Sequence, residues 1–446
     1  MEDFLKDISG LISEAVKIDK TLFDEYNVKR GLRNSDGSGV LVGLTNVGDV
    51  VGYVKDKDGV KPVEGNLRYR GYPITQLVKG FQADKRPGFD ESAFLLLTGK
   101  LPTKAQLNNF SEYLAWNRDL DENFTNMILS LRGKDLMNML ARSVLILYTQ
   151  DETAEDYSHL SLLNQSLGLI AKLPVIVAYS YHGMRHAYSR KNLVIRHPRP
   201  NLSPAENFLY MIKGCNYTAL EAEILDLSFV LHAEHGGGNN SSFTTRVVSS
   251  SMTDTYSAIA AAIGSLKGRL HGGANLKVLE MMEDVKANVK DWASEKEIKQ
   301  YLIKILKKEA FDNSGKIYGI GHAVYTLSDP RAVLLKEKAS ELAKEKGLEK
   351  EFNLYSLVEK LAPAAFHSIK GEKKTISANV DFYSGFVYET IGIPKELFTP
   401  IFAMSRMAGW AAHRLEEVMF SSGRIIRPAY KNVAPCELHY AKINER

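Results

Sequence analysis

The sequence predicts a mainly α-helical protein with a small β-leaning segment near its N-terminus. After Tyr72, most of the chain carries apolar residues at the three- and four-residue spacing of helices. Short β-leaning runs, broken by Asp-Gly pairs, are confined to the region between Val40 and Arg70. The hydrophobic content of 44% and the charged content of 25% are ordinary for a globular protein with a large core. The length of 446 residues corresponds to about three domain-sized units, although fewer large domains are common.

Charge and targeting signals limit the classes of partner. The net charge of +4 comes from an even mix of signs, so neither a nucleic-acid nor a membrane surface is indicated. No apolar run reaches the ~18 residues of a membrane span, and the acidic N-terminus MEDFLKDISG is unlike a signal or transit peptide. Cys215 and Cys436 lie far apart, and a chain of this size needs no disulfide, so a reducing compartment is the simpler interpretation. We therefore expect a cytoplasmic protein without nucleic-acid or membrane partners.

The first seventy residues carry one helical and several β-leaning signals. Residues 4–16 place apolar side chains at helical spacing, which predicts an amphipathic helix. Arg33–Gly39 is polar and glycine-rich, as a loop would be. The β-leaning runs that follow predict a small sheet: Val40–Val42, Val50–Val54 and Leu67–Arg70.

Helix-start and helix-stop residues divide the next part of the chain. Asp90–Thr98 predicts a helix with Asp90 as its N-cap and Gly99 at its end. Leu160–Ser180 is a long and almost uncharged helical stretch, which we expect to be interrupted at Pro174. Further helix starts are indicated by Pro102-Thr103 and by Ser203-Pro204-Ala205-Glu206.

Histidines gather beside glycines between residues 231 and 330. The apolar stripe of a helix over Leu220–His235 ends at His235, which should therefore point inward. His232 and His235 also form H-x-x-H, but a metal site needs a third ligand, and H-E-x-x-H is absent. Three interpretations remain open: a polar ligand site at the helix end, core histidines bonded to backbone, and a metal site. The pattern favours the ligand site.

Two further positions lie at helix junctions. A small-residue helix over Asp254–Gly268 is followed by glycines and a new helix, which places His271 near a helix N-terminus, where an oxyanion is favoured. Asp329-Pro330 starts another helix and leaves Arg331 in its first turn. A cation there is disfavoured by the helix dipole unless an anion, such as a bidentate carboxylate, compensates.

The remaining candidates are weaker when each is taken alone. Gly319-Ile320-Gly321 precedes His322, but no third glycine and no βαβ context support a dinucleotide site. Arg406 lies in an apolar helix over Leu397–Val418, where burial of a guanidinium requires a partner. Arg427 follows a glycine-containing break near the C-terminus. From the local pattern, each of these arginines is more often structural than catalytic.

Several blocks together resemble the citrate/2-methylcitrate synthase family, in the family's order. They span most of the chain from about residue 65, and their combination is specific although no single block is. The blocks are LRYRGYPI (Leu67–Ile74), LLLTGKLPT, LHAEHGGGN, LHGGAN, GIGHAVYTLSDPR, NVDFYSG and Ser405-Arg406 with Arg427-Pro428.

The resemblance implies a two-domain helical fold in a homodimer. Residues 1–274 with 386–446 would form a large domain, and residues 275–385 a small domain that closes over the substrates. The implied reaction condenses oxaloacetate with acetyl-CoA and water to give citrate and CoA, the entry step of the tricarboxylic acid cycle. No metal and no redox cofactor are implied.

The resemblance also assigns roles to individual residues. Asp381 would remove a methyl proton from acetyl-CoA, His271 would donate a hydrogen bond to the thioester oxygen, and His322 would polarise the oxaloacetate carbonyl. A base of this kind works only if the enolate oxygen is stabilised as the proton leaves. The positions that would hold oxaloacetate are His235, Arg331 and Arg406, with Arg427 supplied across the dimer.

The chain departs from the family pattern at two places. Thr326 stands where the family often has a basic residue that would contact CoA phosphate; Lys373 and Lys374 could compensate. The stretch to about residue 60 is longer than expected and could serve the dimer or nothing catalytic. Two alternatives stay open. The first is a 2-methylcitrate synthase using propionyl-CoA, because the choice of acyl group can depend on pocket space for a single methylene. The second is a non-enzymatic helical or metal-binding protein built around His232 and His235.

Overall fold

The computed structural model describes residues 2–57, 59–371, 375–420, 423–434 and 440–445. Within these residues the protein is mainly helical, with 18 α-helices and one three-stranded sheet, as the sequence predicts. The chain divides into two compact units. Thr45–Ile425 forms the body, and Met1–Leu44 with Ile426–Arg446 forms a smaller chain-end unit. The predicted boundaries at residues 275 and 385 fall inside the body, so the division into a large and a small domain stays a prediction.

The chain-end unit contains the predicted N-terminal helix. This helix is α1 (Glu2–Ala15), and it is followed by α2 (Thr21–Glu25) and by the short 3-10 turn η1 (Arg30–Leu32). Val40–Val42 is not a strand, so that prediction is wrong. An extended run becomes a strand only when a second one pairs with it, and the structure gives these three residues no strand partner among the described residues.

The sheet at the start of the body is a hairpin with one short added strand. It consists of β1 (Gly48–Asp56), β2 (Gly59–Tyr69) and β3 (Tyr72–Pro73), which confirms the other two predicted β runs. The antiparallel register of β1 and β2 shifts within the hairpin, because Val51 pairs with Asn66 whereas Tyr53 pairs with Pro62. Gly52 therefore faces residues 63–65 across a bulge, where the hydrogen-bonded ladder is interrupted.

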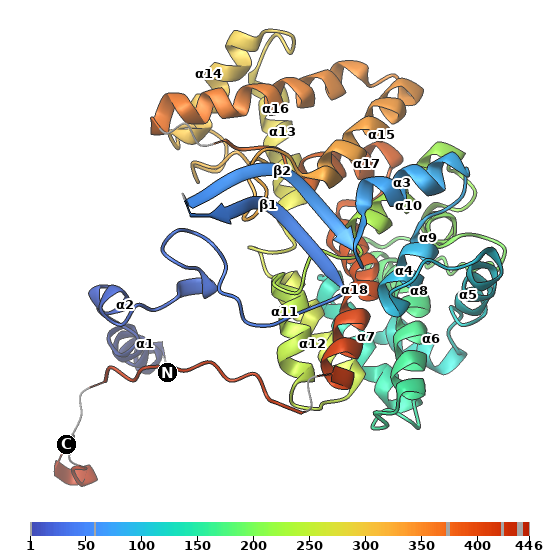
Figure 1. Ribbon diagram of the computed structural model, residues 1–446, viewed down its shortest axis with the longest axis horizontal. Helices are drawn as coiled ribbons and strands as arrows, with labels where there is room; N and C mark the ends of the chain where they lie inside the picture. The colour runs from blue at the N-terminus through green and yellow to red at the C-terminus, as the bar shows by residue number, and fades with distance from the viewer. Residues whose placement is uncertain (1, 58, 372–374, 421–422, 435–439, 446) are drawn as a thin grey trace. The chain divides into compact units, whose positions relative to one another are not determined.

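Helices make up the rest of the body, and α18 runs through its middle (Figure 1). Helix α18 packs against α4, α8, α10, α11 and α12, and most of its side chains are buried. A residue on α18 is therefore surrounded by protein on several sides. In chain order the helices are α3 (Ile74–Ala83), α4 (Phe89–Thr98), α5 (Lys104–Trp116), α6 (Glu122–Ser130), α7 (Leu136–Leu147), α8 (His159–Ser189), α9 (Pro204–Lys213), α10 (Ala219–His232), α11 (Asn240–Ser249), α12 (Thr255–Lys267), α13 (Ala274–Asn288), α14 (Glu295–Leu306), α15 (Pro330–Lys346), α16 (Glu349–Lys370), α17 (Val380–Ile391) and α18 (Phe398–Phe420).

Helix starts that depend on neighbouring residues are confirmed. Thr103 and Ser203 each form a capping box with the residue three positions later, and Asp254 caps α12 through the Ser257 amide. In each case the side chain and the amide that it accepts from are only three residues apart. The signal is therefore complete within a few residues of sequence.

The predicted cap of α4 is wrong. Asp90 lies inside the first turn, and the N-cap position is occupied by Gly88. The amides of Gly88 and Phe89 donate instead to the carboxylate of Asp226 on α10, at 2.6 and 3.3 Å. The cap of α4 thus comes from a distant part of the chain. Burial raises the pKa of Asp226 to about 7.

Two other helix boundaries differ from the prediction. Helix α8 continues through Pro174, because packing on its neighbours holds the helix where one amide is missing. It is long and apolar enough to cross a membrane, but 67% of its most apolar window is buried in the protein, as in a core helix. Helix α10 ends at His232 rather than at His235. The Tyr69 hydroxyl ends it by contacting the Val230 carbonyl at 2.7 Å and the Glu234 amide at 3.2 Å.

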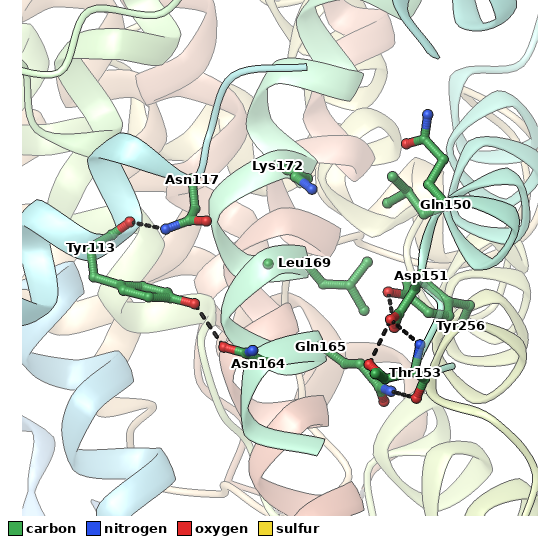
Figure 2. Close-up of a pocket in the computed structure, with 12 residues that line it drawn as sticks. Tyr113, Asn117, Gln150, Asp151, Thr153, Asn164, Gln165, Leu169, Lys172 and Tyr256 are labelled. Atoms are coloured by element: carbon green, nitrogen blue, oxygen red, sulfur yellow. Dashed lines mark hydrogen bonds between the residues drawn. The ribbon is translucent and has the colours of Figure 1, made fainter. Parts of the chain in front are cut away.

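Polar groups also link helices away from the centre of the body. A pocket of about 230 Å³ is lined by residues of α5, α8 and α12, among other elements. Figure 2 shows the side chains around it. Its side chains bond largely to one another: Tyr113 donates to Asn164 at 2.8 Å, and Tyr256 donates to Asp151 at 2.8 Å. These bonds join α5 and α12 to their neighbours.

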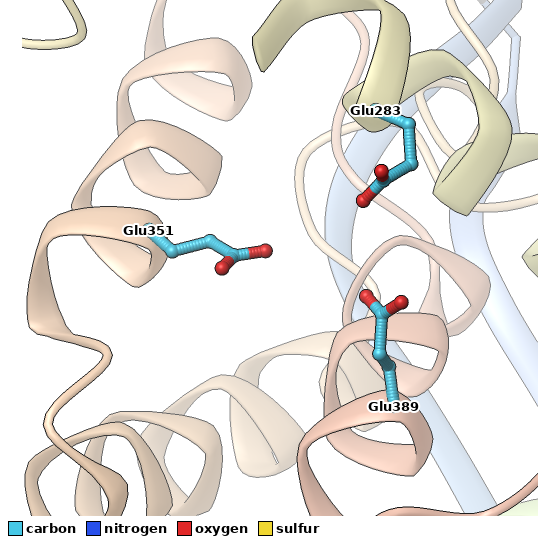
Figure 3. A group of neighbouring side chains, drawn as sticks. All are labelled: Glu283, Glu351 and Glu389. Atoms are coloured by element: carbon cyan, nitrogen blue, oxygen red, sulfur yellow. The ribbon is translucent and has the colours of Figure 1, made fainter.

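Three carboxylates from α13, α16 and α17 converge in the body, as Figure 3 shows. Glu283, Glu351 and Glu389 bring one oxygen each within 4.8 Å of the others. The ammonium group of Lys286 lies 2.5 Å from Glu283 and 2.8 Å from Glu351. A lysine of the chain therefore already neutralises part of this charge, and its pair with Glu351 links α13 to α16.

Candidate active site

His322 and Asp381 are brought together by two segments that pair over a short stretch of extended backbone. The Asn379 amide donates to the Gly319 carbonyl at 2.9 Å, and its side-chain amide donates to the Gly321 carbonyl at 2.9 Å. Gly319 has a φ of 76°, a conformation that favours glycine. This pairing places His322, which precedes α15, beside the first turn of α17, which carries Asp381.

Arg331 has its compensating anion, and the anion is the cap of its own helix. Asp329 caps α15 and accepts two hydrogen bonds from the Arg331 guanidinium, at 3.0 and 2.7 Å. Burial alone would lower the pKa of Arg331, but the charge and hydrogen bonds of Asp329 raise it. The second carboxylate oxygen also accepts from the Val380 amide at 3.3 Å, so Asp329 ties α15 to α17.

Arg406 is a buried cation whose hydrogen-bonding groups are only partly satisfied. It lies on α18 with 0% exposure, and its Nε donates to the His232 carbonyl at 2.6 Å. Nη1 and Nη2 are buried and have no hydrogen-bond partner among the described residues. The face of the Phe402 ring lies 4.7 Å from the guanidinium carbon. Burial lowers the pKa of Arg406 to about 10, so it remains charged and is suited to bind an anion.

His232 and His235 face different partners. The ring of His235 is 5.1 Å from that of His322, whereas the ring of His232 is 4.6 Å from that of Phe402. Burial, followed by the charges of nearby arginines, lowers the pKa of both histidines well below the usual value. Both rings are therefore neutral, and His235 Nε2 is a buried polar atom without a partner in the described part of the chain.

The hydrogen bonds of His271 fix its tautomer. The Ser241 amide on α11 donates to His271 Nε2 at 3.3 Å. An amide can only donate, so Nε2 must accept, and the proton of the neutral ring lies on Nδ1. Burial, with a smaller effect from the charge of Arg406, lowers the pKa of His271 to about 4. His271 is therefore a neutral hydrogen-bond donor through Nδ1 at physiological pH.

His322 takes the opposite tautomer. Its Nδ1 accepts from the amides of Val324 and Tyr325 at 3.0 and 3.1 Å. The neutral ring therefore carries its proton on Nε2. The Tyr325 ring stacks on it with centroids 4.7 Å apart, which holds the plane of the imidazole.

Asp381 is a carboxylate with a raised proton affinity. It lies in the first turn of α17, half-buried, after the cap residue Asn379. Burial raises its pKa to about 6, against the opposing charges of Arg331 and Arg406. At neutral pH it is mostly ionised and a stronger base than an ordinary aspartate.

The structure thus brings together six of the residues that the sequence singled out. These six residues contact one another through their rings or shift one another's pKa. They are His235, His271, His322, Arg331, Arg406 and Asp381. Arg427 is exposed and belongs to the chain-end unit. Lys373 and Lys374 lie outside the described residues.

Sequence reasoning missed side chains that contact these six. Ser241 orients His271, and Asp329 holds Arg331. The Phe402 ring contacts the rings of His232 and His271 and the guanidinium of Arg406. Asp329 carried a local signal, because it is a cap residue two positions before a first-turn arginine. Phe402 lies four residues before Arg406 on α18, which is a local signal for that contact alone. Ser241 carries none, since His271 is 30 residues away in the chain.

Comparison with known proteins identifies the family. The protein-family model for the citrate synthase C-terminal domain matches residues 36–429 of this chain. The chain belongs to the citrate synthase family. It is 35% identical to the citrate synthase of Haloferax volcanii, covering 86% of this chain and 93% of that one. The 2-methylcitrate synthase of Shewanella oneidensis is 33% identical to this chain, and the alignment covers 83% of this chain and 89% of that enzyme.

A solved citrate synthase has the same fold. The enzyme of the thermophilic archaeon Thermoplasma acidophilum, in a ternary complex with carboxymethyl coenzyme A and oxaloacetate, matches with a TM-score of 0.76 and 28% identity over 94% of this chain and 99% of that one. The predictions of a mainly helical citrate-synthase-like fold and of an acyltransferase are confirmed. The non-enzymatic interpretation is wrong.

A cavity is lined by residues that neighbour His271 and His322 in the chain. It measures about 310 Å³ and lies between residues 269–277 and 315–320. Leu270, Ile320 and Phe366 contribute apolar surface, and Arg269 and Lys316 are exposed cations at its edge. In a citrate synthase this combination suits a ligand with an apolar or aromatic part and phosphate groups.

The raised pKa of Asp381 predicts a specific pH dependence. The base acts as the carboxylate, so kcat/KM should fall with one-proton slope as the pH is lowered through about 6. Asp381→Ala should lower turnover by at least ~10²-fold and remove this limb. The measurement is thiol release from acyl-CoA between pH 5 and 9. A limb near the ordinary aspartate value, or wild-type turnover of Asp381→Ala, would remove Asp381 from this role.

Proposed function

We propose that this protein condenses acetyl-CoA with oxaloacetate and hydrolyses the thioester, giving citrate and CoA, as the entry step of the tricarboxylic acid cycle. The observation that carries the proposal is the buried Arg406 guanidinium with two nitrogens lacking partners among the described residues, beside neutral His235 and charged Arg331. Such a set suits a small dicarboxylate, because fork-shaped cations bind carboxylates in fixed geometry.

The first step is removal of a proton from the acetyl methyl group. The Asp381 carboxylate takes the proton, and the electron pair moves onto the thioester oxygen. His271 donates its Nδ1 proton in a hydrogen bond to that oxygen. With a pKa of about 4, His271 is a neutral hydrogen-bond donor at physiological pH. With a pKa of about 6, Asp381 is a stronger base for removing the methyl proton than an ordinary aspartate.

The second step forms the carbon–carbon bond. The enolate carbon attacks the oxaloacetate carbonyl, and the developing alkoxide is stabilised by Nε2–H of His322. The alkoxide then takes up the Nε2 proton, which the ring recovers from solvent. His235, Arg331 and Arg406 hold the two carboxylates. Water then cleaves the resulting thioester, which releases CoA as its thiol. The side chains perform these steps by hydrogen bonding and proton transfer, and we propose that no metal or redox cofactor takes part.

The site draws on both predicted domains. His322, Arg331 and Asp381 fall within residues 275–385, while His235, His271 and Arg406 fall outside that range. We propose that movement of residues 275–385 toward the rest of the body assembles the site around its substrates. Closure would also keep water from the enolate before it attacks.

We propose that two chains pair and that Arg427 of one chain serves the site of the other. Arg427 is exposed and belongs to the chain-end unit, so its side chain is accessible to a second chain. Mixed dimers test this. Chains with Arg427→Ala and chains with Asp381→Ala should each be inactive when expressed alone. Co-expressed chains should regain about a quarter of wild-type activity, because about half of the dimers are mixed and each mixed dimer has one intact site of two. No recovery would place Arg427 in its own chain's site or outside catalysis.

We propose that the cavity beside His271 holds the nucleotide part of the acyl-CoA, with Arg269 and Lys316 near its phosphates. Arg269→Ala with Lys316→Ala should raise the KM for acetyl-CoA about tenfold or more, since each lost charge-assisted contact is worth roughly 1–3 kcal/mol. The KM for oxaloacetate should not change. Lys296→Ala, an exposed lysine on α14, is the matched control. An unchanged acetyl-CoA KM in the double variant would move the phosphates elsewhere.

The alternative is a 2-methylcitrate synthase, favoured by the 33% identity to the Shewanella oneidensis enzyme. The purified protein should release thiol from acetyl-CoA faster than from propionyl-CoA when oxaloacetate is present, measured with a chromogenic disulfide. The reverse preference would assign the protein to the 2-methylcitrate branch. Release with neither substrate, from folded protein, would overturn the proposed function.

A further inference from the structure

The β1–β2 hairpin is bonded to the loop that follows His322. At the hairpin bulge, the Gly52 carbonyl accepts from the Thr326 hydroxyl at 3.0 Å, and the Gly65 amide donates to the Ser328 hydroxyl at 3.2 Å. The bulge interrupts the ladder between the strands at this place. The backbone groups of the hairpin are therefore available to hold residues 323–328.

The two backbones also lie too close for any side chain between them. A methyl group added at Gly52 would lie 2.7 Å from Tyr325 Cα and would overlap the Val324 carbonyl. One added at Gly65 would lie 2.9 Å from the Tyr325 ring and would overlap the Ser328 carbonyl. Neither glycine has a positive φ, so space rather than backbone conformation requires glycine at both positions.

The same hairpin contacts the loop that carries His235. A methyl group at Gly48 would lie 2.7 Å from the Glu234 carboxylate, and one at Gly236 would lie 3.1 Å from Val50. Glu234 is itself fixed by His413 of α18 at 3.0 Å. The hairpin therefore lies against two of the loops that bring imidazoles into the site, those of His235 and His322.

These contacts lead directly to the tautomer of His322. The Val324 and Tyr325 amides, which keep Nδ1 of His322 an acceptor, belong to the backbone that Gly52 touches. We infer that the β1–β2 hairpin positions His322 for catalysis, with Gly52 and Gly65 as its positioning residues. The hairpin holds the two amides in place, the amides direct the Nε2 proton into the site, and that proton polarises the substrate carbonyl. This inference rests on the proposed function and adds a catalytic task for a segment remote in sequence.

Substitution of the glycines separates positioning from simple stabilisation. Gly52→Ala and Gly65→Ala should each lower kcat at least about tenfold, because small displacements of a catalytic group are costly. The KM for oxaloacetate should rise, and the KM for acetyl-CoA should stay within twofold of wild type. Gly80→Ala on α3, where an added methyl group meets nothing within 4 Å, is the matched control and should behave as wild type. All rates are measured well below the unfolding temperature of each variant.

A second pair of variants tests the same contact without crowding. Thr326→Val removes the hydroxyl that bonds to Gly52 and should lower kcat about fivefold, the effect of one lost hydrogen bond. Thr326→Ser keeps the hydroxyl and should restore most of that rate. This pair decides the question if a glycine variant does not fold. A purely structural hydrogen bond would change the unfolding temperature of Thr326→Val and leave kcat unchanged.

The outcomes distinguish this inference from the function on which it rests. Wild-type protein that releases no thiol with either acyl-CoA and oxaloacetate would overturn the proposed function and this inference with it. Active wild-type protein, together with folded Gly65→Ala and Thr326→Val variants of unchanged kcat, would overturn the positioning role alone. A loss of kcat in both variants, with recovery in Thr326→Ser, would establish it.

Discussion

Burial of the Arg406 guanidinium is the constraint on which the site depends. A charge inside a helical body is costly unless its donors are satisfied. Here one nitrogen is satisfied by the His232 carbonyl, and the Phe402 ring covers one face. The remaining donors suit an anion, and α18 holds them at the centre of the packed helices. From its local sequence, Arg406 is more often structural than catalytic. In the structure, it is the strongest indication of a dicarboxylate site.

The same burial sets the protonation states of the neighbours, in opposite directions. Loss of solvent lowers the pKa of His271 to about 4 and raises that of Asp381 to about 6. At neutral pH one is a neutral donor and the other a carboxylate base, which is the pair that proton abstraction next to a thioester needs. The nearby positive charges reinforce the first shift and limit the second. Two roles therefore follow from one environment.

The hairpin shows how backbone packing can serve a site without contributing a side chain to it. Its glycines let two loops approach closely, and the hydroxyl of Thr326 is used for this contact. In the sequence, Thr326 stands out only as a departure from a basic position, and residues 40–70 only as a β-leaning segment. Their relation appears once residues some 270 positions apart along the chain are in contact.

The sequence by itself determined the fold class and the family, and it named most of the candidate site residues. Helix starts such as Thr103 and Ser203 were predictable because the cap and its partner are three residues apart. His271, His322 and Asp381 were recognisable because their motifs are defined by residue type. The tertiary structure decided what depends on distant contacts: Asp226 caps α4, Tyr69 ends α10 before His235, and Ser241 fixes a tautomer. Protonation states belong to this second group, because burial of a charge is a property of the surrounding packing and has no counterpart in a local pattern.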